Sequence, residues 1–334
     1  MESFRYVRAL NDIQAIALAR RAKTAQQGAD IRYIAGGTTL VDLMKLDVER
    51  PQTLIDITHL PLTEIEAAPG GGVEIGAMVR NLDLAHHPLV KRDYPVLSEA
   101  LLSGASAQLR NKATTSGNLL QRTRCMYFRD VAMPCNKREP GSGCGAITGI
   151  NRAMAILGGS EHCVATNPSD MNVALVALEA IVRIHGAAGS RDIPIADFHL
   201  PPGATPQRET VLQPGDLVTH IALPAAAPGS RSTYLKLRDR ASYEFALASA
   251  AVVATVDSGR IQRVRIAMGG VGTKPWRFFE AERRLTGMPA TPDSYRQIAA
   301  AALQDARPQS QNGFKVVLAQ RCLVRALRQA TQTV

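Results

Sequence analysis

The chain has 334 residues, of which 46% are apolar, 20% charged and 4% aromatic, and its net charge is +10. This length allows two or three domains, and the composition is typical of a soluble globular protein. The basic residues are scattered and aromatic side chains are few, so nucleic acid is not an expected partner. The longest apolar stretch, Met171 to Leu178, is too short to span a bilayer, so membrane insertion is not expected either.

The start of the chain predicts a compact α/β unit. The expected elements are a strand at 4–7, a helix from 11 to about 27, a strand at 31–35, a helix at 39–48 and a strand at 53–57. We expect a first subdomain over residues 1–58.

A second subdomain is expected over residues 59–224. It begins with a hairpin around Pro-Gly-Gly-Gly at 69–72 and continues with helices near 82–90, 96–102 and 169–180 and a strand at 181–185. Residues 120–165 lack a hydrophobic period and contain many prolines and glycines. A loop of that length inside a compact domain needs a reason, and a bound metal cluster would supply the missing core.

A proline-rich linker at 223–230 precedes a third domain over residues 230–334. Strands are predicted at 233–237, 245–255 and 261–268, followed by three helices that start near Pro275, Pro292 and Asn312. Helices that follow strands in this way indicate an α+β domain.

Two short turns have the composition of phosphate-binding segments. Residues 35–39 read Ala-Gly-Gly-Thr-Thr after a predicted strand, and residues 114–118 read Thr-Thr-Ser-Gly-Asn. Glycines let backbone N–H groups approach a pyrophosphate, and hydroxyl groups donate to phosphate oxygens. The alternative for residues 35–39 is a plain strand-to-helix turn, and the alternative for residues 114–118 is a bulge in a strand. Together the two turns predict a dinucleotide site, although no GxGxxG fingerprint is present.

Four of the five cysteines gather in the irregular loop with the spacing C-x9-C-x8-C-x18-C. They are Cys125, Cys135, Cys144 and Cys163. Without a C-x2-C pair a zinc ribbon is disfavoured, whereas four thiolates fit a [4Fe-4S] cluster. Zinc and unligated thiols stay open as alternatives, and His162 is a rival ligand to Cys163. Cys322 lies in an apolar helical pattern and is interpreted as an ordinary buried thiol.

Two further features have both a structural and a functional interpretation. Asp170 begins a predicted helix, where it can cap the N-terminus, with Ser169 as the rival cap, or accept hydrogen bonds from a ribityl or ribose hydroxyl. The charged run from Lys236 to Arg240 is either a solvated strand end or the source of a cation that faces a flavin. We find no Ser/His/Asp or paired-carboxylate arrangement, so no catalytic residue is predicted.

Four stretches carry a resemblance to a known family. They are Ala-Gly-Gly-Thr-Thr-Leu at 35–40, Thr-Ser-Gly-Asn at 115–118, Pro-Ser-Asp at 168–170 and Lys-Leu-Arg-Asp-Arg-Ala-Ser-Tyr at 236–243. Over essentially its whole length the chain resembles the FAD-binding medium subunit of the molybdenum hydroxylases, the xanthine oxidase family. Most members lack the four cysteines. The sequence around them is similar to the flavin subunits of bacterial periplasmic aldehyde oxidoreductase, above all, and of 4-hydroxybenzoyl-CoA reductase.

The resemblance implies an α+β fold: a two-subdomain FAD-binding domain of the vanillyl-alcohol-oxidase (PCMH) type, followed by a small α+β domain of the CO dehydrogenase flavoprotein type. It implies FAD contacts from Arg32, Tyr33, Ile34, Ala35, Gly36, Gly37, Thr38, Thr39, Leu40, Thr115, Ser116, Gly117, Asn118, Arg124, Asp170 and Lys236. It also implies that the four clustered cysteines hold a [4Fe-4S] cluster. Many relatives have Gly-Gly-Asn where this chain has Ser-Gly-Asn at 116–118.

The function implied is that of an electron-transfer subunit in a heterotrimeric aldehyde oxidoreductase. A large molybdenum-cofactor subunit would oxidise the substrate, a small [2Fe-2S] subunit would relay electrons, and this chain would pass them to oxygen, a ferredoxin-like carrier or NAD. The alternatives are a free-standing flavin oxidase with its own substrate pocket and a zinc-stabilised scaffold.

The expected location follows from the same resemblance. Residues 1–12 lack the apolar core of a secretory signal, and the Arg20-Arg21 pair precedes no hydrophobic run. We therefore expect assembly in the cytoplasm, where the cofactors are made, and residence in the periplasm as a passenger in the complex.

Overall fold

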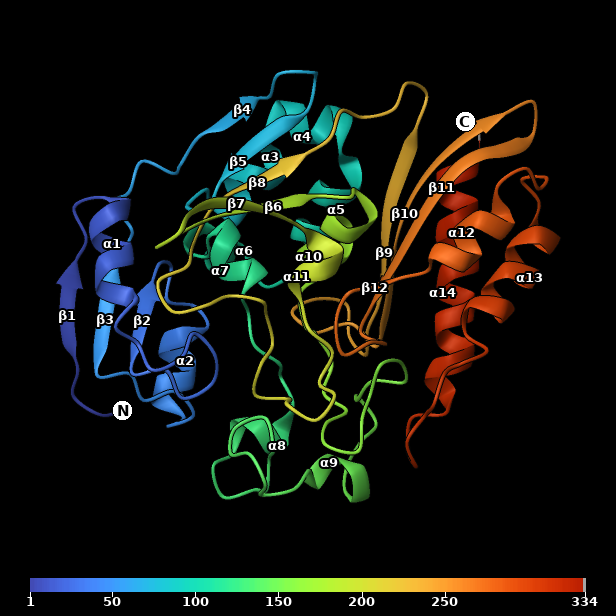
Figure 1. Cartoon of the computed structure of the whole chain (residues 1–334). Helices are drawn as coiled ribbons and strands as arrows, with labels where there is room; N and C mark the ends of the chain where they lie inside the picture. The colour runs from blue at the N-terminus through green and yellow to red at the C-terminus, as the bar shows by residue number, and fades with distance from the viewer. Residues whose placement is uncertain (333–334) are drawn as a thin grey trace.

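The computed structural model describes residues 1–332, in which three separate β-sheets are present. One sheet falls within each of the segments 1–58, 59–224 and 230–332, which we call the first, second and third units and propose as the domains of the chain. Figure 1 shows the first unit at the left, the third at the right and the second above and between them. No helix within residues 1–332 is both long and apolar enough to cross a membrane.

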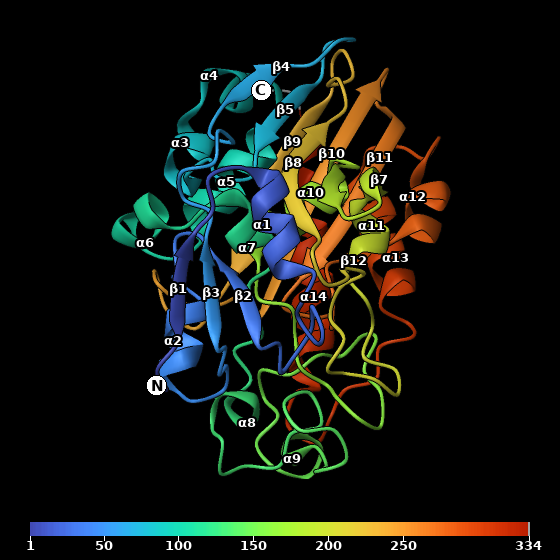
Figure 2. The same cartoon turned by 60° about the vertical axis from the view of Figure 1, so that its left-hand side comes forward.

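The first unit is a parallel three-stranded sheet with strand order β1-β3-β2. Its elements are β1 (Arg5–Arg8), α1 (Asp12–Ala19), β2 (Ile31–Ile34), α2 (Leu40–Lys45) and β3 (Thr53–Asp56). The predicted order of these elements along the chain is confirmed. The central strand β3 is mostly buried, whereas the edge strand β1 is mostly exposed. Figure 2 shows α1 over one face of this sheet.

Helix α1 is shorter than predicted. The side chain of Asn11 caps its start by accepting from the backbone N–H of Gln14, but the helix ends at Ala19 instead of continuing to about residue 27. The residues that follow form turns, in which the side-chain amide of Gln26 donates to the carbonyl oxygens of Thr210 and Leu212 in the second unit. These tertiary hydrogen bonds replace the helical ones that the weak apolar pattern suggested.

The second unit contains a five-stranded sheet of order β4-β5-β8-β6-β7. Its elements are β4 (Ile65–Ala67), β5 (Val73–Gly76), α3 (Asn81–His86), α4 (Pro88–Asp93), α5 (Pro95–Ser103), α6 (Ala107–Lys112), α7 (Thr115–Leu119), α10 (Asp170–Ala177), β6 (Ile181–Gly186), β7 (Gly189–Pro194), α11 (Ile195–Phe198) and β8 (Leu217–Leu223). The β4–β5 hairpin is confirmed. The helix predicted at 82–90 is interrupted at His87. A proline disfavours helical backbone geometry in the residue before it, and His87, which precedes Pro88, has an extended ψ of 132°.

Helix α10 lies between the second and third units. All eight of its residues are buried, and it packs against α5 on one side and against strand β11 (Arg260–Gly269) on the other. A helix buried on every side needs no polar face, which explains the apolar run from Val173 to Ala177. Its first residue, Asp170, is consequently held at the junction of the two units.

The third unit is an antiparallel sheet of order β12-β11-β10-β9 covered by three helices. Its remaining elements are β9 (Arg231–Leu237), β10 (Ala248–Asp257), β12 (Trp276–Arg277), α12 (Phe279–Leu285), α13 (Pro292–Ala302) and α14 (Phe314–Thr331). The α+β arrangement is confirmed, and Figure 1 shows α14 along the sheet. The first predicted helix starts later than Pro275, because Trp276 and Arg277 pair with β11 instead.

The cysteine-bearing segment, residues 120–165, has little regular structure. It contains two single-turn helices, α8 (Met126–Arg129) and α9 (Gly145–Thr148), which lie below the three sheets in Figure 1. We call residues 120–165 the cysteine loop. The guanidinium of Arg138 donates to the carbonyl oxygens of Tyr127 and Phe128 and so closes the loop on itself.

The cysteine loop is also fastened to helix α14. The Asn312 side chain donates to the carbonyl oxygens of Asn151 and Met154, at 3.2 and 3.0 Å. The ammonium of Lys315 donates to the carbonyls of Ala153, at 3.2 Å, and Met154, at 2.8 Å, and to Gly270. Lys315 is fully buried, and burial lowers its pKa to about 7.

Candidate functional site

A large cleft lies where the first and second units meet. It is lined by residues from 31–40, 114–123, 163–168 and 199–218, and its empty space, including the part open to solvent, is about 1810 Å³. We call it the main cleft. Both predicted turns contribute to its wall, although they are about 80 residues apart in the sequence.

The two turns touch each other at Gly36. A Cβ added at Gly36 would lie 2.2 Å from the carbonyl oxygen of Lys112, just before the second turn. Gly37 has a positive φ of 72°, a conformation that other residues rarely adopt. Glycine at 36 is therefore required by backbone contact between the turns, and glycine at 37 by the turn itself.

The second predicted turn is in fact the short helix α7. Thr114 caps it by accepting from the backbone N–H of Gly117 at 3.2 Å. The hydroxyl of Thr115 donates to the carbonyl of Val79, and Asn118 accepts from the hydroxyl of Ser169 at 2.8 Å. These bonds place Thr115 and Asn118 in the protein framework rather than in the cleft wall.

The predicted FAD contacts divide into two groups. Those that line the main cleft are Arg32, Tyr33, Ala35, Gly36, Gly37, Thr38, Thr39, Leu40, Ser116 and Gly117. Those that do not line it are Ile34, Thr115, Asn118, Arg124, Asp170 and Lys236. Ten of the sixteen residues therefore share one wall.

Arg124 and Asp170 lie at a neighbouring cavity. This second cavity, with about 880 Å³ of empty space including the part open to solvent, shares residues 166–168 with the main cleft. The guanidinium of Arg124 forms an ion pair with Asp42 at 2.9 Å and stacks 5.0 Å from the centre of the Phe245 ring. A ligand in the main cleft reaches Arg124 only by extending past residues 166–168.

Asp170 is bound on both oxygens of its carboxylate. Ser169, not Asp170, caps α10, since its hydroxyl accepts from the backbone N–H of Asn172. The carboxylate accepts from the Tyr234 hydroxyl at 2.5 Å and pairs with the Lys236 ammonium at 2.8 Å. Burial and the Asp170 charge raise the pKa of Tyr234. The structure thus brings Asp170 and Lys236 together as a buried ion pair at the edge of the second cavity.

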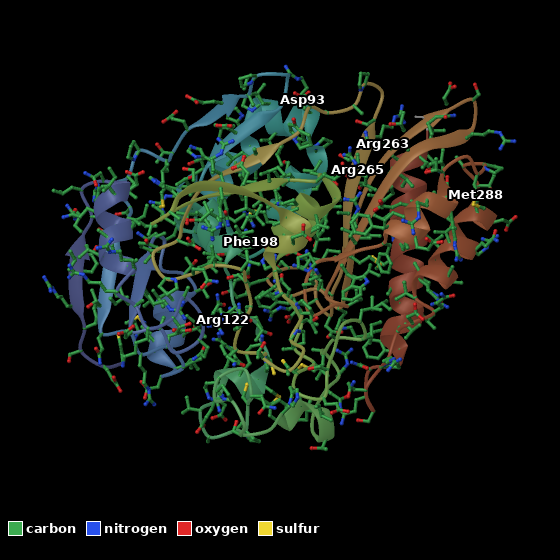
Figure 3. All side chains as sticks on the ribbon, in the orientation of Figure 1. Asp93, Arg122, Phe198, Arg263, Arg265 and Met288 are labelled. Atoms are coloured by element: carbon green, nitrogen blue, oxygen red, sulfur yellow. The ribbon has the colours of Figure 1, made fainter. Side chains whose placement is uncertain are left out.

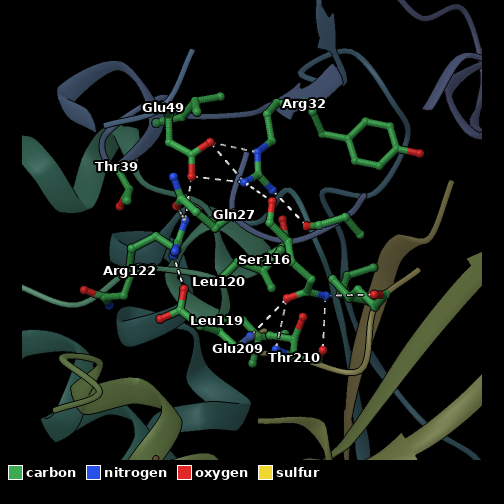
Figure 4. Close-up of a pocket in the computed structure, with 18 of the residues that line it drawn as sticks. Gln27, Arg32, Thr39, Glu49, Ser116, Leu119, Leu120, Arg122, Glu209 and Thr210 are labelled. Atoms are coloured by element: carbon green, nitrogen blue, oxygen red, sulfur yellow. Dashed lines mark hydrogen bonds and ion pairs between the residues drawn. The ribbon is translucent and has the colours of Figure 1, made fainter. Parts of the chain in front are cut away.

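A chain of ion pairs that the sequence analysis does not predict crosses the wall of the main cleft. Its members are Arg32, Glu49, Arg122, Glu209 and Lys137, and we call it the ionic chain. Arg32 binds Glu49 through two nitrogens, at 3.0 and 3.2 Å. Arg122 then bridges Glu49 and Glu209, as Figure 4 shows. Figure 3 labels Arg122 between the first unit and the cysteine loop.

The ionic chain is charged at neutral pH. Although burial would raise it, the charges of Arg122 and Lys137 lower the pKa of Glu209 to about 2. Burial likewise opposes the charge of Arg122, but Glu209 and Glu49 raise the pKa of this guanidinium. The wall of the main cleft therefore holds fixed charges of alternating sign.

His199 is a second cleft residue that the sequence analysis misses. Its Nε2 lies 3.1 Å from the carbonyl oxygen of Leu119, whereas the buried Nδ1 has no partner within residues 1–332. Burial lowers the pKa of His199 to about 4, so the ring is neutral at pH 7. Phe198, labelled in Figure 3, meets the ring edge-on with centroids 5.0 Å apart. A neutral ring with a buried, unpartnered Nδ1 therefore lies at the main cleft.

All four clustered cysteines line one small cavity inside the cysteine loop. They are Cys125, Cys135, Cys144 and Cys163. Its empty space is about 270 Å³, and we call it the cysteine cavity. Within residues 1–332, no group of three or more His, Cys, Asp or Glu side chains is arranged to hold a single metal ion. The thiols thus surround a space instead of meeting at one point.

The thiols of the cysteine cavity are mostly shielded from water. Burial raises the pKa of Cys125 to about 12 and also raises the pKa of Cys163, where the charge of Lys137 acts in the opposite direction. His162 lines the same cavity next to Cys163. Cys322 lies apart, buried in α14 against the third sheet, as predicted for an ordinary core thiol.

The cysteine cavity and the main cleft share a wall. Cys163 and Lys137 line both of them. Two sites predicted from separate motifs are therefore adjacent in the structure.

Comparison with known families defines the class of this protein. Residues 2–226 match the FAD binding domain in molybdopterin dehydrogenase, and residues 232–330 match the CO dehydrogenase flavoprotein C-terminal domain. The chain belongs to the family of FAD-binding medium subunits of the molybdenum hydroxylases. It is an oxidoreductase subunit that binds FAD, and the predicted fold is confirmed.

Individual members of this family are similar to the chain over most of their length. The chain is 48% identical to the aldehyde oxidoreductase FAD-binding subunit PaoB of Escherichia coli, over 99% of both chains. It is 28% identical to the glyceraldehyde dehydrogenase medium chain of Sulfolobus acidocaldarius, over 89% of this chain and 88% of that one. A solved structure of carbon monoxide dehydrogenase from Hydrogenophaga pseudoflava superposes with a TM-score of 0.76 at 27% identity, over 98% of this chain and 97% of that one.

Proposed function

We propose that this chain is the FAD and [4Fe-4S] electron-transfer subunit of a molybdenum-dependent aldehyde oxidoreductase. The observation that carries the proposal is the wall that the main cleft and the cysteine cavity share at Lys137 and Cys163. Electron transfer between two centres requires that they lie close together, and the two sites of this chain are adjacent. FAD, when bound, exchanges electrons singly or in pairs, and the cluster exchanges them singly.

The main cleft fits FAD at the two adjoining turns. Gly36 lets the two turns approach each other, Gly37 allows the positive φ of the first turn, and Thr38, Thr39 and Ser116 are hydroxyl-bearing residues that line the same cleft. We propose that these residues hold the pyrophosphate. Contacts from Arg124, Asp170 and Lys236 then require that the cofactor extend into the second cavity.

The cysteine cavity fits a cluster better than a single ion. In a [4Fe-4S] cluster each thiolate binds a different iron atom, so the four sulfurs surround the metal core instead of converging on one point. The four cysteines of this chain line a common cavity, which supports such a set of ligands. Binding would displace protons from thiols whose burial now keeps them protonated.

The rival proposal of a free-standing flavin oxidase is less well supported. Three carboxylates line the main cleft, and all are held in ion pairs. Glu49 and Glu209 pair with Arg32, Arg122 and Lys137, and Asp216 pairs with Arg191. Groups bound in this way stabilise the site and are not free to exchange protons with a substrate. We therefore assign substrate oxidation to a partner subunit.

The proposed partners are a large molybdenum-cofactor subunit and a small [2Fe-2S] subunit. Support comes from the names of the relatives, which include aldehyde oxidoreductase and dehydrogenase subunits and medium chains. Electrons would leave this chain for oxygen, a ferredoxin-like carrier or NAD. We further propose assembly in the cytoplasm and transport of the folded complex to the periplasm.

The proposal is tested by the iron and FAD content of the purified chain and of single Cys→Ser variants at 125, 135, 144 and 163. We expect a flavin band with a broad iron–sulfur shoulder in the wild type. Each variant should lose iron. Those at 125, 135 and 144 should keep FAD, because only Cys163 of the four cysteines also lines the main cleft. Cys322→Ser is the matched control and should keep both.

Three results would count against the proposal. A flavin spectrum without iron would favour the free-standing oxidase, and zinc in place of iron would favour the scaffold. Equal iron content in all five variants would remove the cysteine cavity from the assignment.

A further inference from the structure

Lys137 occupies an unusual position between the two sites. It follows Cys135 by two residues, its side chain is only 9% exposed, and it lines both the cysteine cavity and the main cleft. Its ammonium donates to the carbonyl oxygen of Pro206 and to the carboxylate of Glu209, each at 2.9 Å. Two acceptors thus hold a buried cation beside the thiols.

Lys137 lies close to one of those thiols. Lys137 and Cys163 line the same two cavities, and the Lys137 ammonium is held there by its ion pair with Glu209. A positive charge close to a metal centre stabilises negative charge that is added to that centre. Glu209 is the nearest ionised partner of Lys137 and has the opposite effect.

The ionic chain as a whole carries excess positive charge. It holds three cations and two anions, and it ends at Lys137 beside the cysteine cavity. Interactions between charges are strong in such a buried setting, because water screens them little. Its members come from three separate parts of the chain, so the arrangement is rigidly fixed only in the folded protein.

We propose that Lys137 is a positioning and tuning residue that raises the reduction potential of the cluster, and that Glu209 limits this effect. The inference rests on the proposed function, because it requires a cluster in the cysteine cavity. Reduction adds one electron to the cluster and breaks no bond. A nearby cation therefore favours the reduced form, and a nearby anion favours the oxidised form.

The proposal predicts shifts of opposite sign from two neighbouring residues. Lys137→Met removes the cation and should move the midpoint potential of the cluster to a more negative value. Glu209→Gln removes the anion, keeps an acceptor for Lys137 and should move the potential to a more positive value. Lys137→Arg keeps the charge and should restore a value near that of the wild type.

The experiment is a redox titration of the complete complex, followed by the electron paramagnetic resonance signal of the reduced cluster. Iron content, FAD content and melting temperature are measured on the same samples. Lys91→Gln, an exposed lysine on α4, is the matched control and should leave the potential unchanged. Opposite shifts for Lys137→Met and Glu209→Gln at full iron content would support the proposal.

The outcomes separate this inference from the proposed function. If the wild type contains no iron, the proposed cluster is wrong and the inference falls with it. If iron is present but the two variants leave the potential unchanged or shift it in the same direction, only the tuning role is wrong. Loss of iron from Lys137→Met, Lys137→Arg and Glu209→Gln alike would show that the two residues only maintain the loop, and would also overturn the inference.

Discussion

The main cleft and the cysteine cavity are neighbours, but the chain builds them differently. The main cleft lies between two units that each have an apolar core, and its turns are fixed by close backbone contact at Gly36. The cysteine cavity lies in a loop whose small apolar cluster includes Cys125, Cys135 and Cys163 themselves. The first site is shaped by the packing of two cores, whereas the second, under the proposed function, would be completed by the cluster that its cysteines hold.

The largest effect is expected from a substitution that disturbs the main cleft alone. Gly36→Ala places a Cβ against the carbonyl oxygen of Lys112, and a backbone atom cannot move aside as a flexible side chain can. We expect destabilisation of about 3 kcal/mol or more. FAD affinity should fall at least about tenfold, a change of about 1.4 kcal/mol, while iron content stays near the wild-type value.

The control for that substitution is Gly313→Ala. Gly313 has a φ of −56°, and its added Cβ would meet no atom within 4 Å. FAD content and unfolding free energy should therefore match the wild type. If Gly36→Ala also keeps its FAD, the adjoining turns do not form the binding site.

Lowering the pH should destabilise the folded protein through His199, which lines the main cleft. The pKa of this ring is about 4 in the folded protein and near 6.5 when unfolded, so the unfolded chain binds the proton first as pH falls. The free energy of unfolding should decrease between pH 6.5 and 4, by up to about 3 kcal/mol, and this contribution should not change further below pH 4.

Denaturant unfolding at several pH values measures this effect. The difference in unfolding free energy between wild type and His199→Gln should shrink from pH 6.5 to pH 4, because the variant lacks the titrating group. His86→Gln, which removes an exposed imidazole, is the control and should show no such trend. A difference that is constant with pH would contradict the buried, neutral state of His199.

The smallest expected effect comes from a substitution that loosens the cysteine loop and leaves the main cleft unchanged. Lys315→Met removes the donor to the carbonyls of Ala153 and Gly270, while Asn312 still donates to Met154. We expect a loss of stability of about 1 kcal/mol, near the lower end for unsatisfied carbonyl groups. The iron content should fall while FAD is retained.

The control is Arg321→Met, which changes an exposed residue of the same helix. It should change neither the stability nor the iron content. Equal iron content in the two variants would argue against anchoring by Lys315.

Local sequence patterns predict the strands and turns of this chain better than they predict its tertiary contacts. The order of strands and helices in the first unit, the β4–β5 hairpin and the α+β third unit follow from apolar periodicity and turn residues. Strands β7 and β8 were not predicted, because β7 carries charged residues and β8 follows a long irregular connection. The start of α7 looks like a turn because Ser-Gly-Asn has little helical preference.

The same distinction applies to the candidate site. The glycine turns and the cysteine cluster are local motifs, and the structure places most of their residues around two cavities. Arg122, Lys137, Glu209 and His199 belong to no motif, because each acquires its partners only when distant segments meet. These residues are distinguished by their burial and their contacts in the folded protein, not by their spacing in the sequence.

The attachment of the cysteine loop to α14 imposes an order on biosynthesis. Asn312 and Lys315 contact carbonyl groups that precede them by about 160 residues. The ribosome has therefore passed residue 315 before residues 151–154 can pack against Asn312 and Lys315. Under the proposed function, the cluster would be inserted into an anchored loop only after the third unit has been synthesised to that point.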